Sequence, residues 1–228
     1  MAGKLYGVGV GPGDPELLTI KAARIISECR YIAVPHSKSG RQLALEICKA
    51  YLKNQTIIHI DAPMTYDEQK IKLSYEQSSK ELAKILQCGE DIVFLTLGDP
   101  SVYSTYTYVQ KMVAAMGFET IWIPGVPSFC AAAAYAGIPL CEKDEALHII
   151  PASHAGLEDE ELFFGNAVFM KSGKKLQGLI EKLKEQNKLG KCIVVENVGL
   201  ENQRTIEDLN NLPDDMGYFS LVIYKEGL

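Results

Sequence analysis

The stretch Gly7-Val8-Gly9-Val10-Gly11-Pro12-Gly13-Asp14-Pro15 decides the fold of this sequence of 228 residues. It closes an apolar segment that begins at Leu5 and is typical of a buried strand, and it opens a helix that we expect over residues 16–28. Asp14 is predicted to cap this helix, and Pro15 to lie in its first turn, where a missing N–H costs nothing. A strand-to-helix turn so rich in glycine lets a ligand approach the backbone closely, because no Cβ is in the way.

The glycine spacing does not match a dinucleotide-binding turn. Such a turn needs the spacing Gly-x-Gly-x-x-Gly and an acidic residue at the end of the second strand. The second strand expected here ends with Val34-Pro35-His36, which contains no acidic residue. Pro12 also removes a backbone donor where a diphosphate would need one. We therefore expect a ligand without phosphates at the carboxyl edge of the sheet, where open α/β sheets bind ligands. A nicotinamide dehydrogenase and a purely structural turn remain alternatives.

Strand and helix patterns alternate along the first half of the chain, which predicts a mostly parallel sheet. Thr65 and Glu68 form a capping-box pattern before a long helix. The segment Pro124-Gly125-Val126-Pro127 is a candidate linker, so we expect two α/β domains, residues 1–123 and 124–228. The expected strands cover residues 5–10, 31–34, 56–60, 91–97, 119–123, 146–150, 167–170, 192–196 and 218–224, and the expected helices cover 16–28, 41–50, 105–116, 128–136 and 174–186. The acidic segment 158–161 is expected either to face solvent or to begin a helix.

The composition excludes several classes of protein. A net charge of −6 argues against a basic nucleic-acid-binding surface. Six cysteines without a Cys-x-x-Cys pair argue against a zinc ribbon and indicate a reducing cytoplasm. The four histidines show no metal-ligand spacing, and no apolar segment approaches the ~20 residues of a membrane helix.

Two further glycine turns follow predicted strands. One is Leu97-Gly98-Asp99-Pro100-Ser101-Val102-Tyr103-Ser104, and the other is Ile123-Pro124-Gly125-Val126-Pro127-Ser128. Asp99 either caps the next helix or accepts hydrogen bonds from a ligand. Because the carboxyl ends of parallel strands meet at one sheet edge, the three turns together predict a ligand-binding cleft.

These motifs resemble those of the tetrapyrrole (corrin/porphyrin) methyltransferases. The resemblance includes the alanine-rich helix that ends Ala136-Gly137-Ile138-Pro139-Leu140 and the pair Gln203-Arg204, which begins seven residues after Glu196. Within that family the first two turns are similar to those of the precorrin-2 C(20)-methyltransferases, and Ser104-Thr105-Tyr106 to the anaerobic branch that methylates cobalt-factor II. The resemblance implies two α/β domains with mixed sheets and a cofactor cleft between them. It further implies S-adenosylmethionine as methyl donor, S-adenosylhomocysteine as product, a tetrapyrrole substrate that can carry cobalt, and a homodimer.

Matching positions imply which residues contact the cofactor, whereas the residues named for catalysis and for substrate contact are candidates chosen by their chemistry. The residues expected to contact the cofactor are Pro12, Leu97, Gly98, Asp99, Val102, Pro127, Ser128, Met170 and Val198. Pro127 departs from the family pattern, which usually has threonine there. The candidates for catalysis, including removal of a proton, are Asp99, Tyr103 and Tyr106. The candidates for substrate contact are Gly11, Gly13, His36, Arg41 and Lys171, with Lys174 and Lys175 as further cations, whereas Arg204 is expected to pair structurally with Glu196.

The expected reaction is methylation of carbon 20 of precorrin-2 or cobalt-precorrin-2 in cobalamin biosynthesis. The donor sulfonium loses its positive charge in the reaction, so a carboxylate aimed at the sulfur would stabilise the ground state. Asp99 is therefore expected to hold the ammonium or ribose of the cofactor. Methylation at C(11) or C(17), and a non-catalytic tetrapyrrole- or nucleoside-binding protein, remain alternatives.

Overall fold

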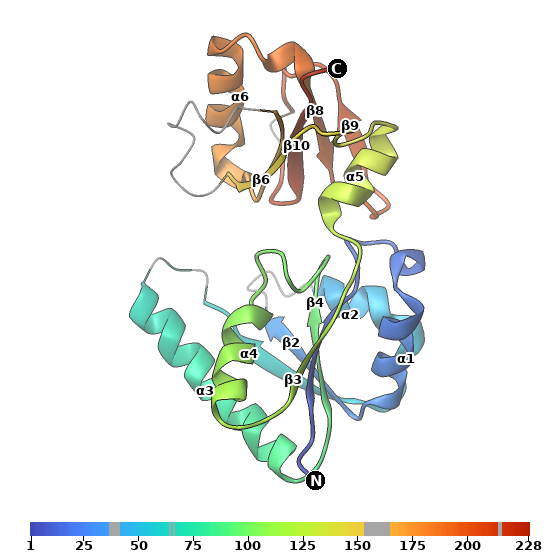
Figure 1. Ribbon diagram of the computed structural model, residues 1–228, viewed down its shortest axis with the longest axis vertical. Helices are drawn as coiled ribbons and strands as arrows, with labels where there is room; N and C mark the ends of the chain where they lie inside the picture. The colour runs from blue at the N-terminus through green and yellow to red at the C-terminus, as the bar shows by residue number, and fades with distance from the viewer. Residues whose placement is uncertain (37–41, 64, 66, 153–164, 214–215) are drawn as a thin grey trace. The chain divides into compact units, whose positions relative to one another are not determined.

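The computed structural model describes the chain except for residues 37–41, 64, 66, 153–164 and 214–215 (Figure 1). The predicted Arg41 site and the acidic segment 158–161 lie outside the described residues. The chain folds as two compact units, Met1–Pro127 and Ser128–Leu228, each with a five-stranded sheet. The sequence predicts a division after residue 123. The units divide after Pro127 because Gly125 packs against the first unit.

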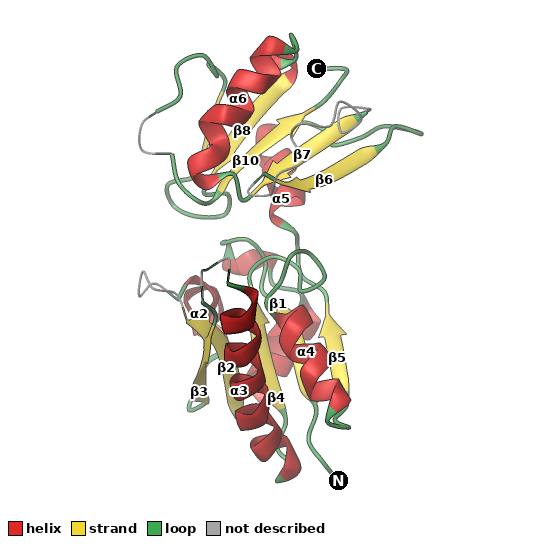
Figure 2. Cartoon of the chain, turned by 90° about the vertical axis from the view of Figure 1, so that its left-hand side faces the viewer, coloured by secondary structure: helices red, strands yellow, loops and turns green. Residues whose placement is uncertain are grey.

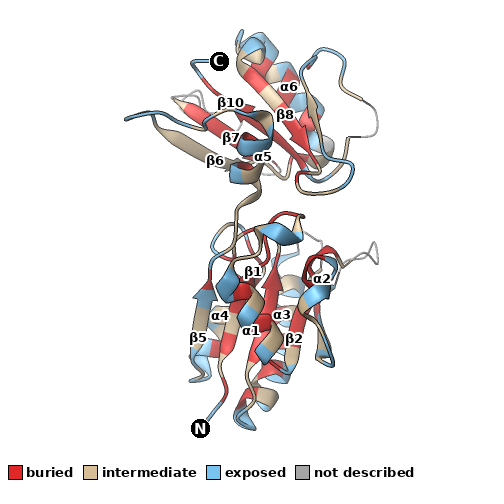
Figure 3. Ribbon diagram, turned by 90° about the vertical axis from the view of Figure 1, so that its right-hand side faces the viewer, coloured by how far each residue is buried: buried red, intermediate tan, exposed pale blue. Residues whose placement is uncertain are grey.

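The sheet of the first unit is parallel throughout, with strand order β3-β2-β4-β1-β5. Its strands are β1 (Leu5–Gly9), β2 (Tyr31–His36), β3 (Thr56–Asp61), β4 (Ile92–Thr96) and β5 (Thr120–Ile123). Every residue of β4 is buried, as expected for a central strand that is covered on both faces. The neighbouring strand β1 is also mostly buried (Figure 3). The parallel arrangement confirms what the alternating patterns predict, and it brings the ends of all five strands to one edge.

Helices cover both faces of this sheet. On one face α3 (Glu68–Gln87) and α4 (Tyr106–Ala115) pack against each other and against the strands, and on the other lie α1 (Ile20–Glu28) and α2 (Leu43–Cys48) (Figures 1 and 2). Short 3-10 turns, η1 (Pro15–Leu17) and η2 (Lys49–Tyr51), complete the connections. No described helix combines the length and the apolar character that a membrane crossing requires.

Two predicted helix starts are wrong. The Asp14 carboxylate accepts a hydrogen bond from the Glu16 N–H at 2.8 Å and caps only η1, while Thr19 caps α1. The reason is that Leu18 is extended (ψ 132°) and interrupts the helical path. Likewise α3 is capped by Asp67, and Thr65 supports this cap by accepting from the Asp67 N–H at 3.2 Å.

Strand β2 continues through Pro35, where the sequence predicts its end. Its pairing with β4 stops at Ala33, so that Pro35 pairs only with Ile60 of β3. Proline is tolerated where a strand has a neighbour on one side only, because its missing N–H breaks no ladder bond there.

The sheet of the second unit is mixed, with strand order β6-β7-β10-β8-β9. Its strands are β6 (Leu147–Pro151), β7 (Asn166–Met170), β8 (Cys192–Glu196), β9 (Arg204–Ile206) and β10 (Ser220–Tyr224). Strands β6 and β7 are parallel, whereas β10 is antiparallel to β7 and β8, and β9 to β8. The predicted mixed α/β class is confirmed here, but β9 is absent from the prediction.

One apolar face of this sheet packs against α6 (Leu176–Glu185), whose buried leucines contact Phe169 and Val222. Helix α5 (Ser128–Ala136) contacts β8 and β10, and the two helices lie on opposite sides of the sheet (Figure 1). The 3-10 turns η4 (Gly173–Lys175) and η5 (Leu189–Lys191) flank α6. Each unit therefore has its own core.

Candidate functional site

The turns after β1 and β4 are joined by backbone hydrogen bonds at the carboxyl edge of the first sheet. The Val10 N–H donates to the Thr96 carbonyl at 2.9 Å. Gly11 and Gly98 form an isolated antiparallel bridge, in which the Gly11 N–H donates at 3.2 Å and the Gly98 N–H donates back at 2.8 Å. Both glycines have positive φ, 77° and 69°, a conformation that glycine adopts without steric cost.

Asp99 ties the third turn to this pair. Its Oδ2 accepts a hydrogen bond from the Gly125 N–H at 2.9 Å, and its Oδ1 accepts from the N–H and the hydroxyl of Ser101. The alternative that Asp99 caps the next helix is wrong, because α4 begins only at Tyr106. The carboxylate is thus held in one orientation by three donors of its own unit.

Glycine is required where the three turns meet. A Cβ on Gly9 would lie 2.6 Å from the Gly125 nitrogen and 2.6 Å from the Gly98 oxygen, and a Cβ on Gly125 would lie 2.2 Å from the Gly98 oxygen. Neither approach is compatible with a side chain. The turns therefore contact one another backbone to backbone.

This arrangement decides what charge the edge can bind. The N–H groups of Val10, Gly11, Gly98 and Gly125 all have acceptors within the protein, so none is left to hold a diphosphate. Among these groups only the Asp99 carboxylate is charged, and it is half-buried. With these four amides already bonded, the edge is better suited to the phosphate-free ligand predicted from the sequence than to a dinucleotide.

The structure brings together most of the predicted cofactor residues of the first unit. Leu97, Asp99 and Val102 are half-buried in the turn after β4, beside Gly98. Pro12 is buried in the turn after β1. Gly11 and Gly13 are buried in the same turn. Their contact with the substrate stays a prediction, and the N–H of Gly11 already donates to Gly98 in the bridge.

The prediction that Tyr106 is catalytic is wrong. Its side chain is fully buried beneath β1, and its hydroxyl lies 3.1 Å from the Ile121 carbonyl and 3.3 Å from the Leu5 carbonyl. Burial raises the pKa of Tyr106 above its ordinary value. A Cβ on Gly7 would come within 2.1 Å of the ring, so Gly7 is the space that admits Tyr106. Tyr106 is a core residue that cannot reach a substrate.

Tyr103 differs from Tyr106 in both exposure and conformation. It is 45% exposed, and its backbone is left-handed, with φ 46°. Such a conformation is a true outlier for a bulky residue. Tyr103 therefore stays a candidate for contact with a ligand.

His36 is exposed at the end of β2, on the same sheet edge. Its ring packs edge-on against His59 at 5.8 Å between centroids. His59 in turn lies 3.1 Å from the Gln42 amide through its Nδ1. His36 remains a candidate for docking an anionic substrate.

In the second unit, β7 and β8 run parallel because each is antiparallel to β10, so their carboxyl ends share an edge. Both strands are followed by a residue with left-handed backbone, Lys171 (φ 55°) and Asn197 (φ 54°). Burial lowers the pKa of Lys171 below its ordinary value. Met170 is half-buried and Val198 is 7% exposed, and both stay predictions for cofactor contact.

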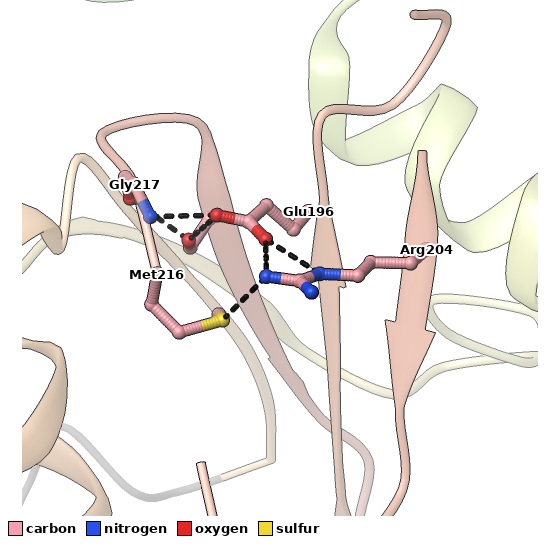
Figure 4. Close-up of polar contacts among 5 residues, drawn as sticks. Glu196, Arg204, Met216 and Gly217 are labelled. Atoms are coloured by element: carbon pink, nitrogen blue, oxygen red, sulfur yellow. Dashed lines mark hydrogen bonds and ion pairs between the residues drawn. The ribbon is translucent and has the colours of Figure 1, made fainter. Parts of the chain in front are cut away.

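The predicted pairing of Arg204 with Glu196 is confirmed (Figure 4). Two guanidinium nitrogens lie 2.7 and 2.8 Å from Oε2 of the buried Glu196. The other carboxylate oxygen accepts from the Gly217 N–H at 2.6 Å and from the Ser220 hydroxyl at 3.3 Å. The motif therefore joins β8, β9 and the segment before β10.

Sequence reasoning missed a second ionic cluster. The Lys225 ammonium is buried and lies 3.0 Å from Glu145 and 3.2 Å from Glu142, and Glu145 also accepts from the Asn166 amide at 2.8 Å. A lysine that follows directly on an apolar strand was the available signal, because buried lysines are paired.

Comparison with known proteins supplies the family. A model of the tetrapyrrole (corrin/porphyrin) methylases matches residues 4–212. The chain belongs to this family. It is 35% identical to a probable cobalt-precorrin-2 C(20)-methyltransferase of Methanocaldococcus jannaschii, over 97% of this chain and 96% of that protein.

Solved structures agree on the fold of this tetrapyrrole methylase. The structure of a cobalt precorrin-4 methyltransferase aligns with 97% of this chain over 94% of its own length, with a TM-score of 0.78 and 18% sequence identity. Uroporphyrin-III C-methyltransferase from Thermus thermophilus, solved with S-adenosylhomocysteine, has a TM-score of 0.71 and 20% identity over 98% of both chains. The fold class predicted from the sequence is thus confirmed.

Proposed function

We propose that this tetrapyrrole methylase transfers a methyl group from S-adenosylmethionine to carbon 20 of precorrin-2 or cobalt-precorrin-2, in cobalamin biosynthesis. The observation that carries the proposal is the end-to-end similarity, at 35% identity, to the relative from M. jannaschii. The cobalt-containing substrate is favoured because that relative is named for it.

The site geometry supports this donor. When bound, S-adenosylmethionine supplies an electrophilic methyl group. The half-buried Asp99 is fixed by Gly125 and Ser101, so its carboxylate can accept hydrogen bonds from the ammonium or ribose of the donor without first being ordered. Leu97 and Val102 flank it with apolar surface. Positioning of this kind supplies much of the acceleration in a direct displacement.

The substrate's carboxylates would be docked by cations and donors at the strand ends. His36 and Lys171 are the candidates within the described residues, with the exposed Lys175 as a further cation. Asp99 remains the candidate for the group that accepts the proton, and the Tyr103 hydroxyl is the alternative that Y103F tests below. Met170 and Val198 are proposed to contact the adenine ring.

Three further expectations belong to the proposal. We propose a homodimer, which sedimentation of the purified protein tests by its mass. We place the enzyme in the cytoplasm, because all six cysteines are free, as is usual in a reducing compartment. Cobalt is proposed to enter as part of the substrate.

The experiment incubates purified protein with S-adenosylmethionine and precorrin-2, with and without cobalt, and locates the new methyl group by NMR. Methylation at carbon 20 supports the proposal. Methylation at C(11) or C(17) contradicts the assigned position but keeps the family chemistry. Binding of the tetrapyrrole without transfer supports the alternative of a non-catalytic binding protein. Preference for the metal-free substrate contradicts the cobalt-dependent assignment.

A further inference from the structure

Tyr103 lies in a loop whose other residues are held from both sides. Before it, the Val102 N–H donates to the Asp99 carbonyl at 3.2 Å. After it, the buried hydroxyl of Ser104 lies 3.3 Å from the Thr96 hydroxyl and accepts from the Tyr106 N–H at 3.0 Å. The loop therefore fixes the backbone of Tyr103 instead of letting it relax.

The conformation so fixed is an unfavourable one. Among the described residues, non-glycine residues with positive φ are Tyr103, Lys143, Lys171, Asn187 and Asn197. Asparagine tolerates this region, and Tyr103 is the one aromatic residue in the set. A glycine would adopt the same backbone without cost. Strain that the surroundings hold in place is concentrated at ligand-binding sites, so this outlier points to a function for the side chain.

The side chain is also exposed where a ligand is expected. The ring of Tyr103 is 45% exposed, four residues after Asp99 in the turn that follows β4. A flat aromatic ring at this place has a natural partner in a flat conjugated ligand, because offset stacking of aromatic faces adds to the burial of their surfaces.

We propose that the Tyr103 ring stacks on the face of the tetrapyrrole macrocycle and fixes its position. The inference rests on the proposed function for the identity of the substrate. In this role the ring matters and the phenolic hydroxyl does not. The strain at Tyr103 is then retained for binding at the expense of stability.

The test compares three variants in the full chain. Y103L removes the ring, and we expect KM for the tetrapyrrole to rise about tenfold, with kcat and the Kd of S-adenosylhomocysteine little changed. Y103F keeps the ring, so its KM for the tetrapyrrole is expected to stay close to the wild-type value. Y103G also relieves the backbone, so its melting temperature should equal or exceed that of the wild type while KM rises as in Y103L.

Lys143 provides the matched control. It is exposed and has φ 49°, but it lies in the second unit, in a turn with no predicted site residue. K143G should gain stability in the same way and leave KM unchanged. If both glycine variants are as stable as the wild type or more stable, but only Y103G loses affinity for the substrate, then Tyr103 has a binding role and not merely a structural one.

Other outcomes overturn the inference. A wild-type KM in Y103L excludes stacking, and a loss of kcat in Y103F assigns the role to the hydroxyl instead. Binding is measured independently of turnover by following the fluorescence of Trp122, the single tryptophan, as the tetrapyrrole is added. If the wild type binds the tetrapyrrole but transfers no methyl group, the proposed function fails while the variants' Kd values still test Tyr103. If it binds no tetrapyrrole, both proposals fall.

Discussion

The Asp99 carboxylate accepts a hydrogen bond from the backbone N–H of Gly125 at 2.9 Å, although 26 residues separate the two in the chain. The bond joins the turns that follow β4 and β5. Together with the backbone bridge between Gly98 and Gly11, this bond connects all three glycine turns at the sheet edge. The carboxylate holds the sheet edge together, and we propose that it also binds the ligand.

Replacing Asp99 by alanine should therefore impair stability and binding together. The Gly125 N–H loses its acceptor, which is expected to lower the free energy of unfolding by about 1–2 kcal/mol. The Kd of S-adenosylhomocysteine, measured by calorimetry, should rise at least about tenfold. Ser101→Ala is the matched control, since it removes only one of the three donors to the same carboxylate. Unchanged affinity in D99A would show that Asp99 has no part in cofactor binding.

Adding one methyl group to Gly125 should be far more damaging than adding it elsewhere. The new Cβ would lie 2.2 Å from the Gly98 oxygen, so the turns must separate. We expect G125A to cost about 3 kcal/mol or more in urea unfolding. In G178A the new Cβ meets nothing within 4 Å, and an interior helix position should gain about 0.5–1 kcal/mol. Equal stability of the two variants would contradict the close approach.

Tyr106→Phe tests the role of Tyr106 in the core. The variant removes the hydroxyl that bonds to the Ile121 and Leu5 carbonyls but keeps the ring beneath Gly7. The expected loss is about 1 kcal/mol of unfolding free energy, with kcat for methyl transfer unchanged. A large fall in kcat at unchanged stability would restore Tyr106 as a catalytic residue.

How far the sequence could predict the molecule depends on how local each signal is. The glycine and proline turns after β1, β4 and β5 are local signals, so the sequence could predict that these turns meet at one edge of the sheet. Helix α1 is capped by Thr19 and not by Asp14 because the backbone of Leu18 is extended. The spacing of residues in the sequence does not reveal this conformation. Strand β9 was missed because it is short, half-buried and formed against β8.

Contacts between distant residues explain the remaining error at the site. The place of Tyr106 depends on the missing side chain of Gly7, 99 positions earlier, and nothing near Tyr106 reports it. Glycine inside a strand often marks a close approach, so Gly7 itself was the overlooked signal.

The buried carboxylate of Glu196 predicts a strong coupling with Arg204. Its side chain is 3% exposed while that of Arg204 is 38% exposed, so the pair is partly desolvated. Glu196→Gln should lower the unfolding free energy by about 2 kcal/mol, less than for a fully buried pair. A double-mutant cycle with R204Q isolates the pairwise energy. The exposed Arg24–Glu28 pair is the control, with an expected coupling below about 0.5 kcal/mol. Equal couplings in the two cycles would contradict the assigned burial.

The Lys225 cluster predicts how stability depends on pH. Hydrogen bonds from Lys225 and Asn166 lower the pKa of Glu145 from 4.5 to about 2. Since the folded-state pKa lies below the unfolded value, Glu145 contributes stability that is complete above pH 4.5 and is lost as the pH falls towards 2. The pKa of Lys225 shifts in the opposite direction. The bond to Glu145 raises the pKa of Lys225 above 10.5, so that its contribution is lost only above that pH.

Glu145→Gln removes the charge without changing the size of the side chain. The melting temperature of the wild type should exceed that of E145Q by a constant amount from pH 5 to pH 9. The difference should shrink below pH 4.5 and vanish only below pH 2, where the wild-type carboxyl is protonated and therefore also uncharged. Glu142→Gln, at the more exposed carboxylate of the cluster, should show a smaller difference. A wild-type advantage that grows as the pH falls from 4.5 would contradict the lowered pKa of Glu145.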